Sequence, residues 1–250
     1  MEMFRAEDYH TAGEPFRILA DLGVEIPGAS VADRRVCAMN SGDIDRVRQI
    51  LCFEPRGHAD MYGGFITPPD DADAHFGVLF WHKDGFSTAC GHGTIALGVW
   101  AVETGRVGAP ETGLTDVVID VPSGRVAARV HTEAGQVVSV DFVNVASYVL
   151  ATGVKVSTFF ADGELDRSPC GSGTCARVAT LAHTGQLADG QELVHGSVVG
   201  STFRARVRAH AVADGRDAVL PEVSGMAYKT GTCTFSVDPR DPLVPGFVLR

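Results

Sequence analysis

The sequence contains one sixteen-residue motif twice, and this duplication constrains the fold more than any other feature. Residues 90–105 read CGHGTIALGVWAVETG and residues 170–185 read CGSGTCARVATLAHTG, with seven of sixteen positions identical. Each copy follows an apolar stretch and an Asp-Gly turn, VLFWHKDGF before the first and VSTFFADGEL before the second. A strand, a tight turn and a second strand therefore lead into each motif. A duplicated unit of this kind predicts two lobes related by a pseudo-twofold axis.

The pattern of apolar residues predicts a β-rich protein with two helices. Apolar and polar residues alternate, as in half-buried strands, at 117–121, 126–132, 137–143 and 203–212. In the two repeats, apolar or small residues instead continue for about four helical turns and end at a glycine. We therefore expect helices over 91–104 and 171–184.

The composition is that of an ordinary globular protein, with 45% hydrophobic and 21% charged residues. A formal net charge of −10 and scattered arginines oppose binding to nucleic acid. The first residues show no apolar leader and no apolar run is long enough to span a bilayer, so we expect a cytoplasmic protein without membrane contact. Its six cysteines should then remain thiols. None of the three lysines has a context that suggests a pyridoxal Schiff base, so we expect chemistry without that cofactor.

Cys90 and Cys170 each stand where a glycine-bearing turn opens a predicted helix. The first N–H groups of a helix have no intrahelical partner and carry about half a positive charge, so they attract anions. Glycines let the backbone approach a small carboxylate closely, and they occur at positions 91, 93, 171 and 173. The same field stabilises a thiolate, whose unperturbed pKa is about 8.5.

Two such helix starts, placed face to face, form a two-base site. A thiolate on one face of a carbon would remove its α-proton while a thiol on the other face delivers one, which inverts the stereocentre. The helix starts would stabilise the negative charge that develops as the carboxylate enolises.

Four motifs resemble those of the proline racemase family: HTAGEP (10–15), FEPRGHADMYGGF (53–65), ACGHGTIALG (89–98) and DRSPCGSGTCAR (166–177). The resemblance runs from residue 10 to the terminal PGFVLR. It implies an α/β (α+β) protein with the diaminopimelate-epimerase-like fold. In that fold, two pseudo-symmetric lobes each hold a central helix clasped by β-strands, and a cofactor-free and metal-free site lies between them.

The resemblance also implies roles for individual residues. Cys90 and Cys170 match the catalytic pair, Asp166 matches the acid that contacts the ring amine, and the positions that receive the substrate carboxylate match Gly91, His92, Gly171 and Ser172. These roles imply a racemase or epimerase that inverts the α-carbon of its small-molecule substrate, proline or hydroxyproline. The family also contains trans-3-hydroxy-L-proline dehydratases, which typically carry threonine at the position of Cys170.

Two further features bear on the substrate. Gly93 stands where proline-specific members often have asparagine, which favours hydroxyproline. The stretch from FEPRGHADMYG to DAHFGVLF is instead more similar to that of the dehydratases. Cysteine at position 170 favours epimerisation, and the dehydratase remains the alternative.

The chain departs from the family after Val156, where a long stretch of the second lobe is missing. We expect a first lobe at 1–140 with the Cys90 helix, a shortened second lobe at 141–195 with the Cys170 helix, and C-terminal strands at 196–250 that return to the first lobe. A lobe without several strands leaves its helix uncovered, a surface that usually demands a partner or causes aggregation. A homodimer would supply such a partner, and a truncated inactive family member is a further alternative.

Several residues also have structural interpretations. A lone buried cysteine is more often core packing than catalytic, and this interpretation is kept for Cys37, Cys52, Cys175 and Cys233. Cys-x-His and Cys-x4-Cys spacings suggest a zinc or redox module, but the tight ligand pairs of structural zinc are missing. Asp166 can cap the turn before Ser168. His10 and Glu14 can form structural salt bridges near the site.

Overall fold

The computed structural model describes residues 2–149, 159–160 and 164–249. From the N-terminus, the first elements are β1 (Glu2–Thr11), β2 (Glu14–Leu19), α1 (Val31–Met39), α2 (Gly42–Cys52), β3 (Gly63–Thr67), β4 (Phe76–His82), β5 (Gly85–Phe86), α3 (Gly91–Glu103), β6 (Gly113–Val121), β7 (Gly124–Glu133) and β8 (Gln136–Val143). They are followed by β9 (Ser147–Tyr148), β10 (Phe159–Phe160), β11 (Glu164–Leu165), α4 (Gly171–His183), β12 (Leu193–Gly196), β13 (Thr202–Ala213), β14 (Arg216–Gly225) and β15 (Ala227–Val237).

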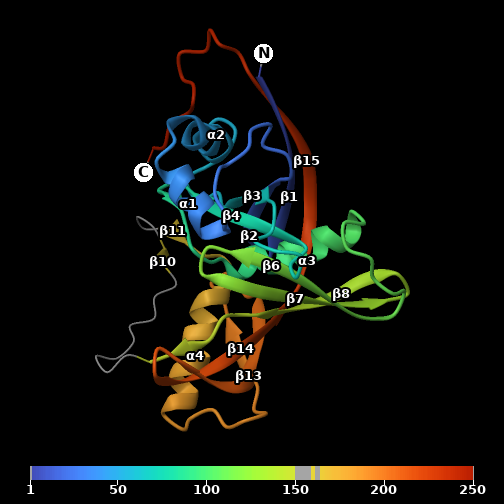
Figure 1. Cartoon of the computed structure of the whole chain (residues 1–250). Helices are drawn as coiled ribbons and strands as arrows, with labels where there is room; N and C mark the ends of the chain where they lie inside the picture. Colours follow the sequence, from blue (N-terminus) through green and yellow to red (C-terminus); the bar gives the residue numbers. More distant parts are fainter. Residues whose placement is uncertain (1, 150–158, 161–163, 250) are drawn as a thin grey trace.

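One sheet of 13 strands runs through both lobes (Figure 1). Its order is β12-β13-β14-β8-β7-β6-β4-β3-β2-β1-β15, with β5 beside β4 and β9 beside β14. Strand β8 links the lobes, because it pairs with β7 on one side and with the last four residues of β14 on the other. Buried and exposed residues alternate along β7 and β13, as their sequences predict. Strands β10 and β11 form a separate pair before Cys170, where the second repeat predicts a hairpin.

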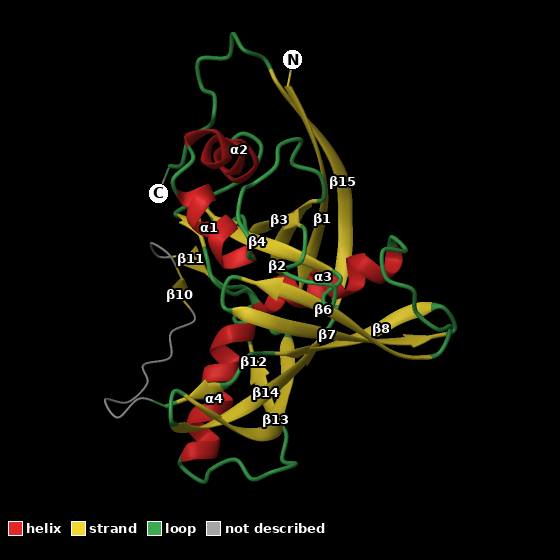
Figure 2. Ribbon diagram, viewed as in Figure 1, coloured by secondary structure: helices red, strands yellow, loops and turns green. Residues whose placement is uncertain are grey.

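The two repeats form the central helices, as predicted. Helix α3 covers Gly91–Glu103 and helix α4 covers Gly171–His183, each ending one residue before the expected boundary. In Figures 1 and 2, α3 crosses the middle of the molecule, while α4 lies at one end beside β13 and β14. Among the described residues, no helix combines the length and the apolar character needed to cross a membrane.

Helices α1 and α2 were not predicted from the sequence. Each begins at a serine N-cap: Ser30 forms a capping box with Asp33, and Ser41 accepts a hydrogen bond from the backbone of Ile44. Their apolar faces form a second core cluster with Phe65 and Trp81, distinct from the cluster around α3. These two helices cover the outer face of the first lobe.

The C-terminal strands divide between the two ends of the molecule. Strands β13 and β14 pack against α4, whereas β15 pairs along the whole of β1. The division of the chain at residues 140 and 195 stays a prediction. Of the strands after residue 196, β15 makes the return to the N-terminal sheet.

Candidate active site

Cys90 and Cys170 occupy equivalent places as the N-cap residues of α3 and α4. Each sulfur accepts a hydrogen bond from the backbone N–H three residues on, Gly93 or Gly173, with an N–Sγ distance of 3.3 Å in both lobes. Cys90 has an extended backbone, but Cys170 has φ +66°, which is uncommon for a residue with a side chain. Backbone strain of this kind clusters at functional sites.

The two helix starts touch each other. A Cβ added to Gly91 would lie 2.6 Å from the Cα of Gly171, and a Cβ added to Gly171 would lie 2.5 Å from the Cα of Gly91. No side chain fits at either position, so both must be glycine. The contact brings the two helix N-termini together, as the duplicated motif predicts.

A small cavity opens beside this contact, with a volume of about 200 Å³. Pockets for drug-sized ligands measure about 300–1,000 Å³, so this cavity suits only a small molecule. Its lining includes all seven residues singled out in the sequence, Cys90, Gly91, His92, Asp166, Cys170, Gly171 and Ser172. The structure therefore brings the predicted site residues of both lobes together.

His92 and Ser172 hold matching places after the two cysteines but differ in burial. His92 is buried, with its Nδ1 3.4 Å from the sulfur of Cys90 and its ring edge-on to Phe16 and Tyr62. Burial lowers the pKa of His92, so the imidazole is neutral near pH 7. Ser172 is exposed. Among the described residues, no group of three or more His, Cys, Asp or Glu side chains is arranged to hold a metal ion.

Asp166 lies at the cavity and also orders the loop that leads to Cys170. One of its carboxylate oxygens accepts hydrogen bonds from the backbone N–H and the hydroxyl of Ser168, at 2.8 and 2.7 Å. The Ser168 hydroxyl in turn accepts the N–H of Cys170 at 3.0 Å. The turn-capping interpretation of Asp166 is confirmed.

Burial raises the pKa of both thiols. For Cys90 the pKa lies well above the ordinary value, and the charges of Asp166 and Cys170 raise it further. The pKa of Cys170 rises to about 12, mainly through burial and then through Asp166. The N–H groups of Gly93 and Gly173 lower both values, so the helix starts act in the predicted direction but burial outweighs them. With pKa values raised in this way, both thiols hold their protons near neutral pH.

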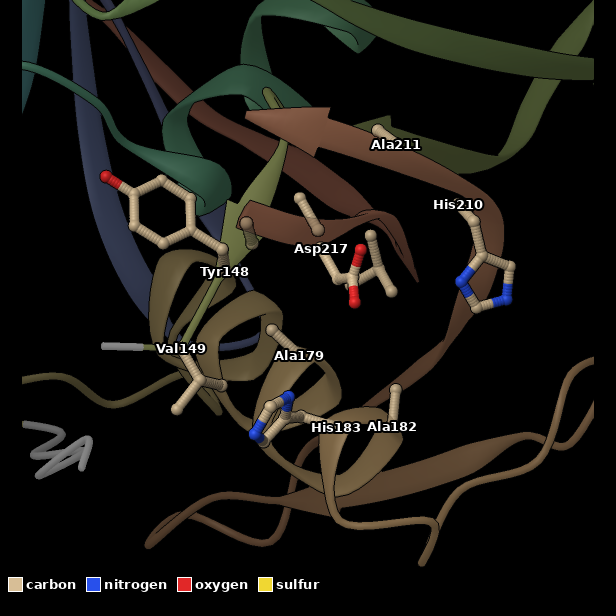
Figure 3. Close-up of a pocket in the computed structure, with 11 residues that line it drawn as sticks. Tyr148, Val149, Ala179, Ala182, His183, His210, Ala211 and Asp217 are labelled. Atoms are coloured by element: carbon tan, nitrogen blue, oxygen red, sulfur yellow. The ribbon is translucent and has the colours of Figure 1, made fainter. Parts of the chain in front are cut away.

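A second hollow, of about 280 Å³, lies between α4 and strands β13 and β14 (Figure 3). Its lining includes Tyr148, Ala179, His183 and Asp217. None of the seven predicted site residues lines it. It is therefore separate from the cavity between the cysteines.

Four residues that line the cavity were not identified from the sequence: Tyr62, His82, Ser87 and Ala89. Tyr62 and Ser87 join by a hydrogen bond between their hydroxyls, and the Tyr62 ring also packs against His82. Their positions in the sequence could have indicated a place near the site. Tyr62 belongs to the family-like stretch 53–65, and the other three residues lie just before Cys90.

Comparisons with known proteins give the family of the chain. The family model described as proline racemase matches residues 7–159 and 157–248. A 3-hydroxyproline 2-epimerase from Burkholderia multivorans is 34% identical, with 97% of each chain covered. A trans-3-hydroxy-L-proline dehydratase from Bacillus thuringiensis subsp. konkukian is 33% identical, covering 99% of this chain and 98% of the relative.

A solved structure supports the predicted fold. The crystal structure of a hydroxyproline epimerase from Agrobacterium vitis, with bound trans-4-hydroxy-L-proline, superposes with a TM-score of 0.86 at 21% identity. The superposition covers 99% of this chain and 96% of that chain. The two-lobed fold expected from the sequence is confirmed.

The comparisons also bear on the shortened second lobe. The two alignments span 330 and 333 positions, at least 80 more than the 250 residues of this chain. The two parts of the family match meet at residues 157–159. Both findings agree with a segment missing after Val156, a position outside the described residues. With a family match over most of its length and relatives above 30% identity, the chain belongs to the proline racemase family.

Proposed function

We propose that this protein is a cofactor-independent racemase or epimerase that inverts the α-carbon of proline or a hydroxyproline. One observation carries the proposal: Cys90 and Cys170, equivalent residues of the two lobes, line one small cavity at the point where the helix starts meet. Relatives at 33–34% identity that are named for hydroxyproline reactions support the substrate class.

In the proposed reaction, the substrate carboxylate binds at the two helix starts, formed by Gly91 and His92 in one lobe and Gly171 and Ser172 in the other. Asp166 accepts a hydrogen bond from the ring ammonium. The thiolate of one cysteine removes the α-proton, and the thiol of the other delivers a proton to the opposite face. The negative charge passes from the α-carbon to the enolised carboxylate, where the helix starts stabilise it.

The proposed chemistry needs one thiolate, but the raised pKa values keep both thiols protonated near neutral pH. The negative charge of Asp166 contributes to this state, because it raises the pKa of both thiols. A ring ammonium bound beside Asp166 neutralises that charge, so substrate binding favours loss of one thiol proton. Thiolate formation is then coupled to binding of the ring ammonium.

The shortened second lobe determines the turnover rate and the oligomeric state that we expect. Exposure of Ser172 leaves the Cys170 side of the cavity open to water, which weakens electrostatic stabilisation. We therefore expect slow turnover from this 250-residue chain, and a homodimer that covers α4 would raise it. A cytoplasmic location, where thiols stay reduced, suits the mechanism.

Incubation in deuterated water tests the proposal directly. Proline, 4-hydroxyproline and 3-hydroxyproline are assayed side by side, with chirality and α-deuterium followed by NMR. Two-base exchange places deuterium at the α-carbon of both stereoisomers of one of these substrates. Deuterium in a single stereoisomer, with no inversion of any ring, would contradict the proposal.

The dehydratase is the second candidate, because a relative at 33% identity carries that name. A dehydratase needs one strong base and only a mild acid to assist loss of the 3-hydroxyl, so threonine suffices at the second position. Cys170→Thr should therefore stop inversion while leaving one-sided exchange by Cys90. Keto-acid or imine release from 3-hydroxyproline by the wild type, without inversion, would favour the dehydratase.

A further inference from the structure

The turn between β1 and β2 touches both lobes beside the active site. Its central residues, Ala12 at φ +53° and Gly13 at φ +99°, have the positive φ values that a type I′ hairpin turn requires. The hydroxyl of Thr11 donates to the carbonyl oxygen of His92 at 2.9 Å, in the first turn of α3. The carbonyl oxygen of Ala12 accepts from the hydroxyl of Ser201 at 2.7 Å, in the loop between β12 and β13.

Glu14 follows this turn and is 0% exposed. Its Oε2 accepts the backbone N–H of Arg167 at 2.7 Å, within the loop that carries Asp166 and Cys170. The Arg167 guanidinium donates to Asp60 at 2.6 Å and lies 3.8 Å from Glu14. The Oε1 atom of Glu14 is buried and has no hydrogen-bond partner among the described residues.

This geometry favours an uncharged carboxyl group. A buried carboxylate is costly unless both oxygens are paired, and Glu14 pairs one. Two carboxylates, Asp166 and Asp60, oppose a charge on Glu14, and the cation Arg167, which favours it, already donates to Asp60. The two thiols also lie within electrostatic reach of Glu14.

We propose that Glu14 is a positioning residue, which holds the Asp166–Cys170 loop against the first lobe as a neutral acid and so adds no second negative charge beside the thiols. The inference rests on the proposed two-thiol function. It identifies a residue outside the cavity lining whose charge contributes to how readily Cys90 and Cys170 ionise.

The pKa of Glu14 agrees with its buried and partly unpaired position. Burial raises the pKa of Glu14 to about 8, and the charges of Asp166 and Asp60 add to this, while Arg167 opposes it. An ionised Glu14 raises the pKa of both Cys90 and Cys170. Above about pH 8, ionisation of Glu14 therefore suppresses thiolate formation in the wild type.

Peptide-resolved alkylation by iodoacetamide, from pH 7 to 10, tests this coupling in the full chain. Glu14→Gln keeps the shape and the acceptor for Arg167 but stays neutral. At pH 9, Cys90 and Cys170 should both react faster in the variant than in the wild type, because the Glu14 charge that raises the pKa of the two thiols is then absent. Cys233 on β15 is the internal reference and should react equally in both proteins.

Glu222→Gln is the matched control, because Glu222 is also buried but pairs with Arg206 and Arg208 on β13, away from the cavity. It should leave the profiles of Cys90 and Cys170 unchanged. Superimposable profiles for Glu14→Gln and wild type would overturn the proposal, as would an equal change in Glu222→Gln. Alkylation needs no turnover, so failure of the proposed function, measured by α-proton exchange, is distinguished from failure of this inference.

If Glu14→Gln does not fold, an infrared pH titration of the wild type tests whether Glu14 is a neutral acid at pH 7. A carboxylic acid band should be present at pH 7 and disappear as the pH rises through about 8. A spectrum without such a band at pH 7 would show that Glu14 is charged and would overturn the proposal.

Discussion

Helices α3 and α4 begin with the same Cys-Gly-x-Gly-Thr pattern and end before the same Thr-Gly pair, yet they are covered very differently. Every residue from Gly91 to Ala101 is buried, whereas in α4 only Gly171, Thr174, Cys175, Val178 and Ala179 are buried. Helix α3 packs against β1, β2, β7, β8 and β15, and α4 packs against β9, β13 and β14. The cap hydrogen bond is nonetheless the same, with an N–Sγ distance of 3.3 Å in both, although the backbone is extended at Cys90 and has a positive φ at Cys170.

The difference in burial between α3 and α4 follows from the residues in which the two copies of the motif differ. Buried Leu97 of α3 corresponds to exposed Arg177 of α4, and buried Trp100 corresponds to half-buried Thr180. The geometry of a helix start depends on its own first turn and on the facing helix start, not on full coverage of the rest of the helix. We therefore expect the two cysteines to be equivalent in chemistry and the two helices to be unequal in stability.

The largest expected effect tests whether the cysteines are equivalent. Cys90→Ser and Cys170→Ser should each reduce inversion of the α-carbon by about 10²- to 10⁴-fold, because a hydroxyl cannot replace a thiol as acid or base near neutral pH. The measurement is α-deuterium incorporation with chiral analysis of the product. Cys175→Ser, a buried thiol outside the cavity, is the control and should retain exchange. Retained inversion in either active-site variant would remove that cysteine from the mechanism.

The next effect tests whether α3 and α4 contribute unequally to the stability of the fold. Leu97→Ala should lower the free energy of unfolding by about 2–5 kcal/mol, since it leaves a cavity among fully buried side chains. At the matching position of α4, Arg177→Ala should change it by no more than about 0.5 kcal/mol, as exposed substitutions usually do. Urea denaturation of both variants gives the two values. Similar losses would mean that α4 is covered as fully as α3, for example by a second copy of the chain.

Much of this arrangement was predictable because it is local. A helix start with its cysteine cap and glycines is specified by a few consecutive residues, and a copy of it elsewhere in the chain signals pseudo-symmetry. The alternation of apolar residues likewise predicted β6, β7, β8 and β13. All seven predicted site residues line one cavity because the two motifs meet at their glycines.

The features that were missed depend on contacts between distant segments. Tyr62 reaches Ser87 only because β3 pairs with β4, a register that neither stretch specifies alone. The buried state of the thiols, which raises their pKa, also follows from the packed lobes and not from the motif. The sequence suggests a structural salt bridge for Glu14. In the structure the Arg167 guanidinium lies 3.8 Å from Glu14 but donates to Asp60, and the unpaired oxygen of Glu14 is visible only in three dimensions.

The smallest expected effect is the pH dependence of stability that comes from Glu14, which holds the loop before Cys170 against the first lobe. Its pKa in the folded protein, about 8, lies above its ordinary value of 4.5, so the folded state holds this proton more tightly than the unfolded state. The stabilisation is complete below the ordinary value and is lost as the pH rises through about 8. Relative to Glu14→Gln, the wild type should lose at least about 1.4 kcal/mol of unfolding free energy across this range. Urea denaturation at several pH values measures it, and parallel curves would contradict a shifted Glu14.

Protection of the thiols by pyrrole-2-carboxylate, a planar mimic of the deprotonated ring, tests the central claim most directly. Each cysteine is alkylated with and without the ligand, and the modified peptides are quantified by mass spectrometry. If the two lobes share one site, the ligand should slow alkylation of both Cys90 and Cys170 and leave Cys37 and Cys233 unchanged. Protection of only one of the two, or of neither, would contradict a shared two-thiol site.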